Sequence, residues 1–505
     1  MSPNRIMLVG LWAGCTTGEI KIPRDTGELP ESPPVTSDSE ERDSGGADTG
    51  RPTDDSTPPD SDTGTAPPPV DDPTRCDGVL PGVDTVKWCG RTEDEWAGAR
   101  VSVGVGAADG LHVAIGTYLA SVESLEETNR VVYLPTLTSV SGWFDEGPLI
   151  QGVAGEDYAW FGWDLLAGSD IDGDGYGDLV VGAFASRGEC EYSGEVTDCT
   201  GRVYTYLGPD LSGRTVTDSD AVVMGWGVLN YFGQTLATVG DLDGDGDDET
   251  LVGGAINDPS QTSLLTGPIE TMSRLEAAAT YSSDGNGGPG SDVGAADLDA
   301  DGVPELLLVD RTRKEEGIGA VWIIPSDLRG GVAVHDHPCV CADDDASLLG
   351  LALTTGDVNA DGYADFAIDL FDPSDGPGVI LGPIPRSVGL SDMDAMFLVD
   401  TVNYTLFPQI VGDLDGDGVS GDLLIGSGNP SALYLLPAPL EAGTYTPDTT
   451  LQITSRDSAT GLGYAMAPLP DMNGDGVDDA LIGEPGDSEG ATEAGAVYLL
   501  YGASW

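Results

Sequence analysis

The chain has 505 residues, with 87 Asp and Glu against 20 Lys and Arg, for a formal net charge of −67. Such an acidic chain repels nucleic acid and anionic membrane surfaces, which excludes both as partners and favours cations. The length would fit several ordinary domains, but a repeated pattern covers most of it, which indicates one repeat domain preceded by a tail.

Residues 1–15 have the pattern of an export signal. An apolar run follows Arg5 and ends at Cys15, and it is too short to span a bilayer. The sequence Leu11-Trp-Ala-Gly-Cys15 resembles a bacterial lipobox, in which the cysteine is lipidated. We expect export and a lipid anchor at Cys15, on the cell surface or in the outer membrane. A plain signal peptide with secretion, or a misassigned start, are the alternatives.

Residues 16–75 consist mainly of Pro, Thr, Ser, Asp, Glu and Gly. Such a segment has too few large apolar side chains to offset the loss of chain entropy on folding. We therefore expect a disordered stalk between the signal and the repeat domain.

The six cysteines that follow Cys15 occur close together in pairs, which indicates disulfides in an exported protein. The candidate pairs are Cys76 with Cys89, Cys190 with Cys199, and Cys339 with Cys341. Sequence leaves the connectivity open, and a Cys339–Cys341 bond would close a small, strained ring.

Zinc is an alternative for the last pair, because His335 and His337 precede Cys339 and Cys341 at alternate positions. In an extended strand such residues lie too far apart for one tetrahedral site. A local disulfide with exposed histidines is the preferred interpretation.

From about residue 96 to residue 505 the chain alternates short apolar strands with turn residues and shows no helical periodicity, which predicts an all-β region. An acidic, glycine-rich loop occurs six times, and its starts lie 56 to 71 residues apart. The loops begin at Asp170, Asp241, Asp297, Asp357, Asp413 and Asp471. A strand leads into each loop and two strands follow it. A seventh unit precedes them and keeps only Asp109-Gly110 of the loop.

Carboxylates at loop positions 1, 3, 5 and 9, with a backbone carbonyl at position 7, are the oxygen ligands that Ca²⁺ prefers. We expect up to six structural Ca²⁺ ions, and glycine at position 6 would let each loop fold around its ion. The expected ligands are Asp170, Asp172, Asp174, Tyr176, Asp178, Asp241, Asp243, Asp245, Asp247, Glu249, Asp297, Asp299, Asp301, Val303, Glu305, Asp357, Asn359, Asp361, Tyr363, Asp365, Asp413, Asp415, Asp417, Val419, Asp422, Asp471, Asn473, Asp475, Val477 and Asp479.

The alternatives for the loops are an EF-hand, a Mg²⁺ site and a solvated acidic turn. An EF-hand needs a Glu at position 12, where this chain has only aliphatic residues: Val181, Val252, Leu308, Ile368, Leu424 and Ile482. Asn359 and Asn473 replace Asp at position 3, which predicts lower affinity. An extra residue places Gly421 at position 9 of the Asp413 loop and Asp422 one later, which predicts a weak or distorted site.

These motifs resemble the FG-GAP repeats that build the seven-bladed propeller heads of integrin alpha subunits and their bacterial relatives. The resemblance rests on Phe161-Gly162 with Gly182-Ala183, Phe232-Gly233 with Gly253-Gly254-Ala255, and Leu462-Gly463 with Gly483-Glu484-Pro485. It implies a seven-bladed β-propeller over residues 76–505, with calcium-binding hairpin loops in six blades. It also implies closure of the last blade by an N-terminal strand, for which residues 78–90 are the candidate, tethered by a Cys76–Cys89 bond. The blades around Asp297 and Asp357 depart from the pattern, with Val309-Asp310 and Asp369-Leu370 at the ends of their central strands.

The resemblance favours a non-enzymatic, monomeric cell-surface module for binding or adhesion, which recognises a protein or a glycan through propeller loops. Three histidines and no recognisable Ser or Cys nucleophile give hydrolase chemistry little support. His112 alternates with apolar residues, which favours a packing or surface role. The alternatives are an enzyme or lectin with a site at the central channel, and a structural envelope component without a specific ligand.

Overall fold

The computed structural model divides the chain into two units, Met1–Ala66 and Pro67–Trp505. It describes residues of the second unit only. These are residues 76, 80–91, 95–117, 130–134, 142–144, 149–151, 160–192, 195–225, 231–254, 261–283, 288–311, 319–341, 349–370, 376–384, 387–389, 392–398, 406–456, 460–489 and 491–503. The predicted signal, the lipidation site at Cys15 and the predicted stalk lie outside the described residues.

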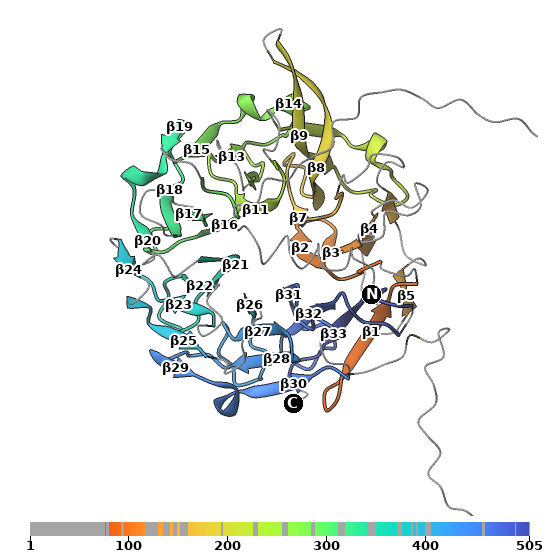
Figure 1. The fold of residues 1–505 in the computed structure, drawn as a ribbon, viewed down its shortest axis with the longest axis vertical. Helices are drawn as coiled ribbons and strands as arrows, with labels where there is room; N and C mark the ends of the chain where they lie inside the picture. Colours follow the sequence, from red (N-terminus) through yellow and green to blue (C-terminus); the bar gives the residue numbers. More distant parts are fainter. Residues whose placement is uncertain are drawn as a thin grey trace, which may run out of the picture. The chain divides into compact units, whose positions relative to one another are not determined.

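The second unit is an all-β, seven-bladed propeller, as predicted (Figure 1). Each blade is a sheet in which four successive strands pair antiparallel, and the first strand of each blade lies nearest the centre of the ring.

The first four blades have the following strands. Blade 1 comprises β2 (Arg100–Gly106), β3 (Gly110–Thr117), β4 (Arg130–Leu134) and β6 (Leu149–Gln151). Blade 2 comprises β7 (Leu165–Ser169), β8 (Asp178–Tyr192), β9 (Glu195–Tyr206) and β10 (Ala221–Met224). Blade 3 comprises β11 (Thr235–Gly240), β12 (Glu249–Gly253), β13 (Gln261–Leu265) and β15 (Ala279–Ser282). Blade 4 comprises β16 (Asp292–Ala296), β17 (Glu305–Asp310), β18 (Ala320–Pro325) and β20 (Cys339–Cys341).

The remaining three blades follow the same order. Blade 5 comprises β21 (Leu349–Gly356), β22 (Asp365–Leu370), β23 (Gly378–Ile380) and β25 (Ala395–Phe397). Blade 6 comprises β26 (Leu406–Ile410), β27 (Leu423–Gly428), β28 (Ser431–Leu436) and β30 (Leu451–Thr454). Blade 7 comprises β31 (Met466–Leu469), β32 (Asp479–Glu484), β33 (Ala496–Leu500) and β1 (Thr85–Cys89).

Short parallel strands extend five of the blades at their outer edges. Each one belongs to the connection before the fourth strand of the next blade, so it ties two neighbouring blades together. They are β5 (Gly142–Trp143) on blade 7, β14 (Met272–Ser273) on blade 2, β19 (Gly330–Ala333) on blade 3, β24 (Val388–Gly389) on blade 4 and β29 (Gly443–Tyr445) on blade 5. The helical segments among the described residues are short 3₁₀ turns: η2 (Val216–Asp218), η3 (Arg274–Glu276), η4 (Val334–Asp336) and η6 (Pro447–Thr449).

The hydrophobic core lies between the blades. Seven clusters of buried residues each join two neighbouring blades, so that every blade is covered on both faces. A strand buried on both faces needs a nearly continuous apolar sequence rather than an alternating one. The central strands have such sequences; all six residues of β32 (Asp479–Glu484) are buried.

The paired glycines of the repeat lie where neighbouring blades approach most closely. Gly162, with a φ of +84°, follows Phe161, and a Cβ placed on Gly116 of blade 1 would lie 2.5 Å from its carbonyl oxygen. A Cβ on Gly182 would lie 2.2 Å from the carbonyl oxygen of Gly233 in blade 3. Only glycine permits this approach. At the position in blade 4 that matches Gly182, Val309 packs in the core instead, so this departure from the repeat keeps the blade intact.

The N-terminal strand β1 closes the ring by pairing antiparallel with β33, from Thr85 opposite Leu500 to Cys89 opposite Ala496. The structure contains a Cys76–Cys89 disulfide next to this strand and a Cys339–Cys341 disulfide in blade 4. The side chains of Cys190 and Cys199 lie outside the described residues.

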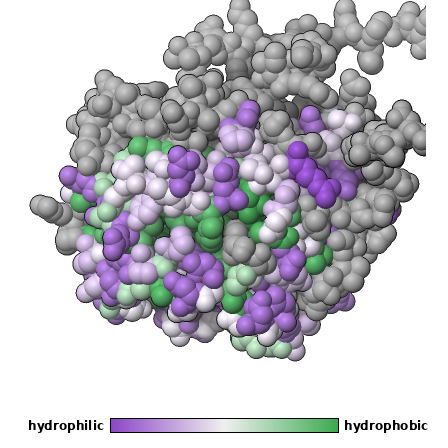
Figure 2. All heavy atoms as spheres, turned by 90° about the horizontal axis from the view of Figure 1, so that it is seen from below, coloured by the Kyte–Doolittle hydropathy of each residue, from purple (hydrophilic) through white to green (hydrophobic). Residues whose placement is uncertain are grey.

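Figure 2 shows hydrophilic residues spread among hydrophobic ones over the described part of the face seen from below. No helix in the described part of the chain is both long enough and apolar enough to cross a membrane.

The packing of Leu80 tests how much ring closure contributes to the stability of the fold. Leu80 precedes β1, is 2% exposed and packs with Leu433, Ile453 and Leu500 between blades 6 and 7. Because its loss would leave a cavity, Leu80→Ala should destabilise the fold by about 2–5 kcal/mol. Urea denaturation followed by tryptophan fluorescence measures the change. Leu451→Ala, at a side chain that is 45% exposed, is the control and should stay within about 0.5 kcal/mol of the parent. Equal midpoints for the two variants would contradict the closing role of Leu80.

Candidate metal sites

The six acidic loops lie between the first and second strands of blades 2 to 7. The loop that begins at Asp170, for example, joins β7 to β8. All six loops therefore have the same place in their blades, at the ends of the inner strands.

All six loops fold in the same way around the carboxylate at position 1. The position 6 glycine has a positive φ in each, from +87° at Gly175 to +102° at Gly246. Its N–H donates to the position 1 carboxylate, as from Gly175 to Asp170 Oδ2 at 2.9 Å. The matching bonds run from Gly246 to Asp241, Gly302 to Asp297, Gly362 to Asp357, Gly418 to Asp413 and Gly476 to Asp471. The loop is thus organised around a carboxylate even where Asn occupies position 3.

The carboxylate at the start of the central strand is buried in five of the six loops and half-buried at Glu305, and it ties the loop to the rest of its blade. In blade 2, Asp178 accepts hydrogen bonds from the N–H of Ile171 and from the N–H of Gly208 after the third strand, both at 2.7 Å. Asp365 and Asp479 make the same two bonds in blades 5 and 7. A position 9 residue therefore has a structural role besides that of a candidate ligand.

The extra residue in the Asp413 loop is absorbed without loss of this arrangement. Gly421 adopts a φ of +107°, and Asp422 takes the place of the position 9 carboxylate. Its oxygens accept the N–H of Leu414 at 2.9 Å and of Ala438 at 2.7 Å. The insertion lengthens the loop while the carboxylate keeps the same partners.

The electrostatics of the loops favour a bound cation. Burial, together with the neighbouring carboxylates of Asp172 and Asp170, raises the pKa of Asp178 to about 7. Burial also raises the pKa of Asp365 and of Asp422 to about 6. A divalent cation among these groups would reverse this effect by favouring their ionised forms.

Several loop oxygens have the surroundings expected of metal ligands. Carboxylate oxygens of Asp170, Asp172 and Asp178 lie within 4.8 Å of one another. Oδ1 of Asp170 and Oδ1 of Asp172 are buried, yet neither has a hydrogen-bond partner among the described residues. A buried oxygen without a partner is costly, and a hard cation would satisfy both. The residues present therefore fit Ca²⁺.

The same kind of cluster forms in three further loops. Its members are Asp241, Asp243 and Asp245; Asp297, Asp299 and Glu305; and Asp413, Asp415 and Asp422. The loops with Asn at position 3 keep the shared fold, and in both of them the Asn side chain bonds to the position 5 carboxylate, as from Asn359 to Asp361 at 3.0 Å. At position 7 the N–H of Tyr176, Asp247, Val303, Tyr363, Val419 and Val477 donates to the position 5 carboxylate.

Sequence reasoning missed the residues that link one loop to the next. Asp248 of blade 3 accepts the N–H of Asp170 at 3.0 Å, and its own N–H donates to the carbonyl of Asp170 at 2.7 Å. Asp478 of blade 7 makes the same pair of bonds with Asp413 of blade 6. Both occupy position 8, where an additional acid is the only signal in the sequence.

Blade 1 has a histidine in place of the position 9 carboxylate. His112 is 3% exposed and contacts the Asp109 carboxylate at 2.8 Å and the Tyr133 hydroxyl. Asp109 in turn accepts the N–H of Gly177 in blade 2 at 3.1 Å. His112 therefore packs inside the blade, so of the two roles that the sequence favours, packing or surface, the structure shows packing.

The zinc alternative fails in blade 4. Cys339 and Cys341 are bonded to each other, so neither thiolate is available as a ligand. His335 is exposed in η4 (Val334–Asp336). The local disulfide is as expected, but only one of the two histidines is exposed, because His337 is half-buried.

Charged and aromatic residues meet at the hub, defined here as Arg100, Trp163, Asp164, Asp292 and Tyr464 at or just before the inner strands. The Arg100 guanidinium lies 5.2 Å from the Trp163 ring and 5.9 Å from the Tyr464 ring. Its Nε is 3.9 Å from Asp164 Oδ1. Burial raises the pKa of Asp292 to about 8, and the Asp164 carboxylate contributes to the shift.

An aromatic cluster adjoins the hub in blades 2 and 3. The ring of Phe184 lies 4.9 Å from that of Trp163, 6.0 Å from that of Trp160 and 5.7 Å from that of Tyr231. Acids and aromatics therefore lie together at the hub, which favours the alternative of an enzyme or lectin site at the central channel.

Two segments, residues 161–197 and 462–500, match the FG-GAP repeat family. Integrin alpha-IIb of Mus musculus is 31% identical over 162 residues, which cover 30% of this chain and 15% of that protein. Integrin alpha-PS2 of Drosophila melanogaster is 28% identical over 232 residues, which cover 41% of this chain and 16% of that protein. Integrin alpha-7 of Homo sapiens is 31% identical over 160 residues, which cover 30% of this chain and 13% of that protein. The chain thus spans less than a fifth of the length of these relatives. Two of its segments thus match FG-GAP repeats, and the chain is similar to integrin alpha subunits over part of its length.

Two substitutions in one loop should separate the structural role from the ligand role. Asp178→Ala removes a buried acceptor of two backbone N–H groups, so it should destabilise the protein by about 2–4 kcal/mol even in EDTA. Asp174→Ala, its control, should leave stability in EDTA within about 0.5 kcal/mol and weaken calcium binding. Chemical denaturation in EDTA and calcium titration measure the two effects. If Asp178→Ala left the stability in EDTA unchanged, the structural role of this carboxylate would be contradicted.

Proposed function

We propose that the chain is a calcium-stabilised, non-enzymatic binding or adhesion module that is displayed at the cell surface. The repeated loop geometry supports the calcium part, because all six hairpins hold the carboxylate at position 1 in the same hydrogen bond. The similarity of the propeller to integrin alpha subunits supports a binding role. A lipid anchor at Cys15 would hold the module at the cell surface.

In this proposal calcium has a structural role. Each ion would join the start of a loop, through positions 1, 3 and 5, to the first residue of the next strand, through position 9. The ion would thereby hold the inner hairpin of the blade closed and offset part of the charge of −67. The partner, a protein or a glycan, would bind to loops of the ring.

A second candidate is a ligand site at the hub, either catalytic or lectin-like. The observation that favours it is the meeting of Asp164 and Asp292 with Arg100 and the rings of Trp163 and Tyr464. Aromatic faces can bind apolar or cationic parts of a ligand, and the carboxyls can bind polar groups. None of these five residues is a candidate calcium ligand.

Calcium removal tests the first part of the proposal. A ligand at 100 times its dissociation constant adds about 2.7 kcal/mol per site, so several occupied loops should raise the melting temperature strongly. We expect excess EDTA to lower the melting temperature by more than about 10 °C, and added Ca²⁺ to restore it. Differential scanning calorimetry measures the shift. An unchanged melting temperature would contradict the structural role of calcium.

A binding screen in calcium tests the second part and separates the two candidates. A glycan array and proximity labelling should identify a ligand that is lost in EDTA. Trp163→Ala should preserve that binding if the loops recognise the ligand. If the same substitution abolishes binding while the melting temperature in calcium is unchanged, the hub is the site and the loop proposal is wrong.

A further inference from the structure

Closure of the ring depends on contacts between the two ends of the second unit. Strand β1 pairs with β33 over five residue pairs. The Cys76–Cys89 disulfide joins β1 to the segment just before it, so this bond does not connect β1 to the rest of blade 7. A covalent link between β1 and blade 7 would have to come from another pair of side chains.

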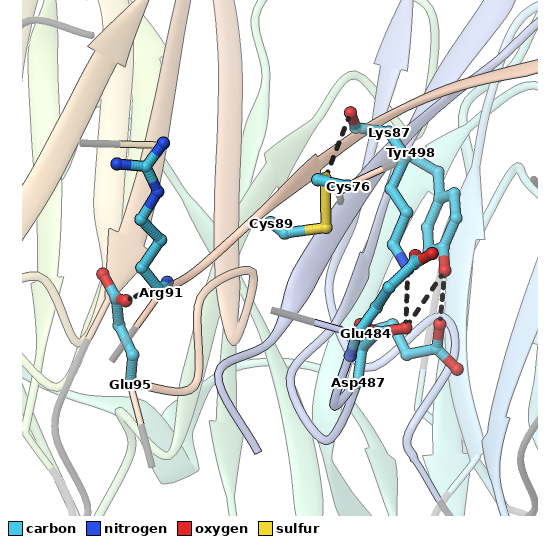
Figure 3. The surroundings of a disulfide bond; sticks show 9 residues. Cys76, Lys87, Cys89, Arg91, Glu95, Glu484, Asp487 and Tyr498 are labelled. Carbon is cyan, nitrogen blue, oxygen red and sulfur yellow. Dashed lines mark hydrogen bonds and ion pairs between the residues drawn. A yellow bond between two sulfur atoms is a disulfide. The ribbon is translucent and has the colours of Figure 1, made fainter. Parts of the chain in front are cut away.

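Lys87 lies in the middle of β1 and points into such a group of side chains (Figure 3). It is 2% exposed. Its Nζ lies 2.8 Å from Asp487 Oδ2 and 2.5 Å from Glu489 Oε2, which belong to the connection between β32 and β33. The amine also lies 5.3 Å from the centre of the Tyr498 ring.

The group holds more acids than the single amine can neutralise. Glu484 is also buried, and its Oε2 accepts the Tyr498 hydroxyl at 2.9 Å. Burial raises the pKa of Glu484. An ammonium and its carboxylate partners are costly to keep charged away from water, even as a pair. Conversion of one ion pair into an amide would remove two of these charges.

We propose that Lys87 and Asp487 form an intramolecular amide bond that closes the propeller covalently. The ammonium first gives a proton to the Asp487 carboxylate, and the neutral Nζ then attacks Cγ. A new N–C bond forms, a C–O bond breaks, and one water molecule leaves. The sum is ammonium plus carboxylate to amide plus water, so the step needs no oxidant, reductant or further reactant.

The carboxylates of Asp487 and Glu489 have different surroundings, and their roles in the reaction follow from this difference. Asp487 Oδ1 accepts the N–H of Glu489 at 2.9 Å, and the N–H of Asp487 donates to the Glu484 carbonyl at 3.1 Å. These bonds fix the carboxyl and polarise it toward attack, as backbone donors do for an acyl group. Glu489 contacts Nζ directly, so it can take a proton from the attacking amine and deliver it to the leaving oxygen. Contact between the reacting groups in the folded chain supplies the proximity.

The amide bond would join β1 to the connection between β32 and β33 of the same blade, through side chains 400 residues apart in sequence. The link spans almost the whole propeller, so an opened blade 7 could not separate from β1. The amide bond involves neither calcium nor the ligand. A negative result for the bond would therefore not bear on the proposed function.

Peptide mapping of the purified full chain tests the bond. After reduction, alkylation and proteolysis, we expect the peptide that contains Lys87 to be linked to the peptide that contains Asp487. The mass of the linked pair should equal the sum of the two peptides less one water molecule. Recovery of the Lys87 peptide in unlinked form only, from folded protein, would show an ion pair only and overturn the proposal. A link to Glu489 instead would overturn the assignment of Asp487.

Variants supply matched controls. Lys87→Arg and Asp487→Ala should abolish the link, and Glu489→Gln should lower its yield at least tenfold. Asp487→Asn should restore a link with loss of ammonia instead of water, a signature that an ion pair cannot produce. Lys314→Arg, at one of the three lysines of the chain, should leave the link unchanged. If a variant fails to fold, the mapping of the parent chain still decides the question.

Discussion

The propeller depends on one local interaction, the hydrogen bond from the position 6 N–H to the position 1 carboxylate of each acidic loop. It occurs in all six loops, from Gly175 to Asp170 in blade 2 through Gly476 to Asp471 in blade 7. It sets the path of the chain between the inner strand and the central strand. The position 9 carboxylate then secures the turn from the other side, because it is buried at the start of the central strand and accepts backbone N–H groups. Carboxylates that the fold brings together in this way repel one another, and a bound cation would offset this repulsion.

The second constraint is the close approach of neighbouring blades. Gly116, Gly182 and Gly483 each lie so near the next lead-in strand that a Cβ would meet its backbone. The hydrophobic clusters on either side of each blade complete these contacts. A ring built this way has one weak point, where its two ends meet. At that point β1, the Cys76–Cys89 disulfide and the Lys87 contacts are all concentrated (Figure 3).

Much of this arrangement could be predicted from the sequence, because it depends on local patterns that repeat. The acidic positions, the glycine at position 6 and the aliphatic residues at position 12, such as Val181, predicted a hairpin followed by a buried strand in each unit. The glycine pairs, which the structure places at blade contacts, predicted the propeller through a family resemblance. The Cys76 and Cys89 spacing correctly indicated a disulfide.

What could not be predicted depends on which segments become neighbours in space. Asp248 and Asp478 link loops of adjacent blades, and their only signal in the sequence is an additional acid at position 8. Arg100 meets Asp164 and Tyr464 at the hub, and no local pattern marks these three residues. The sequence favoured a packing or surface role for His112, but its equivalence to Asp178 appears only from the strand register. The two-residue edge strands, such as β14 and β24, are too short to leave a pattern. Their pairing comes from the packing of one blade against the next.

In the proposed function, the acidic loops bind calcium as part of the folded structure. The most direct test is the number of Ca²⁺ ions per chain in protein purified with calcium and freed of loosely bound ions, measured by inductively coupled plasma mass spectrometry. We expect several ions per chain, up to six, with none in blade 1. A content below one ion per chain, in protein that retains its β-sheet circular dichroism and its cooperative melt, would contradict it.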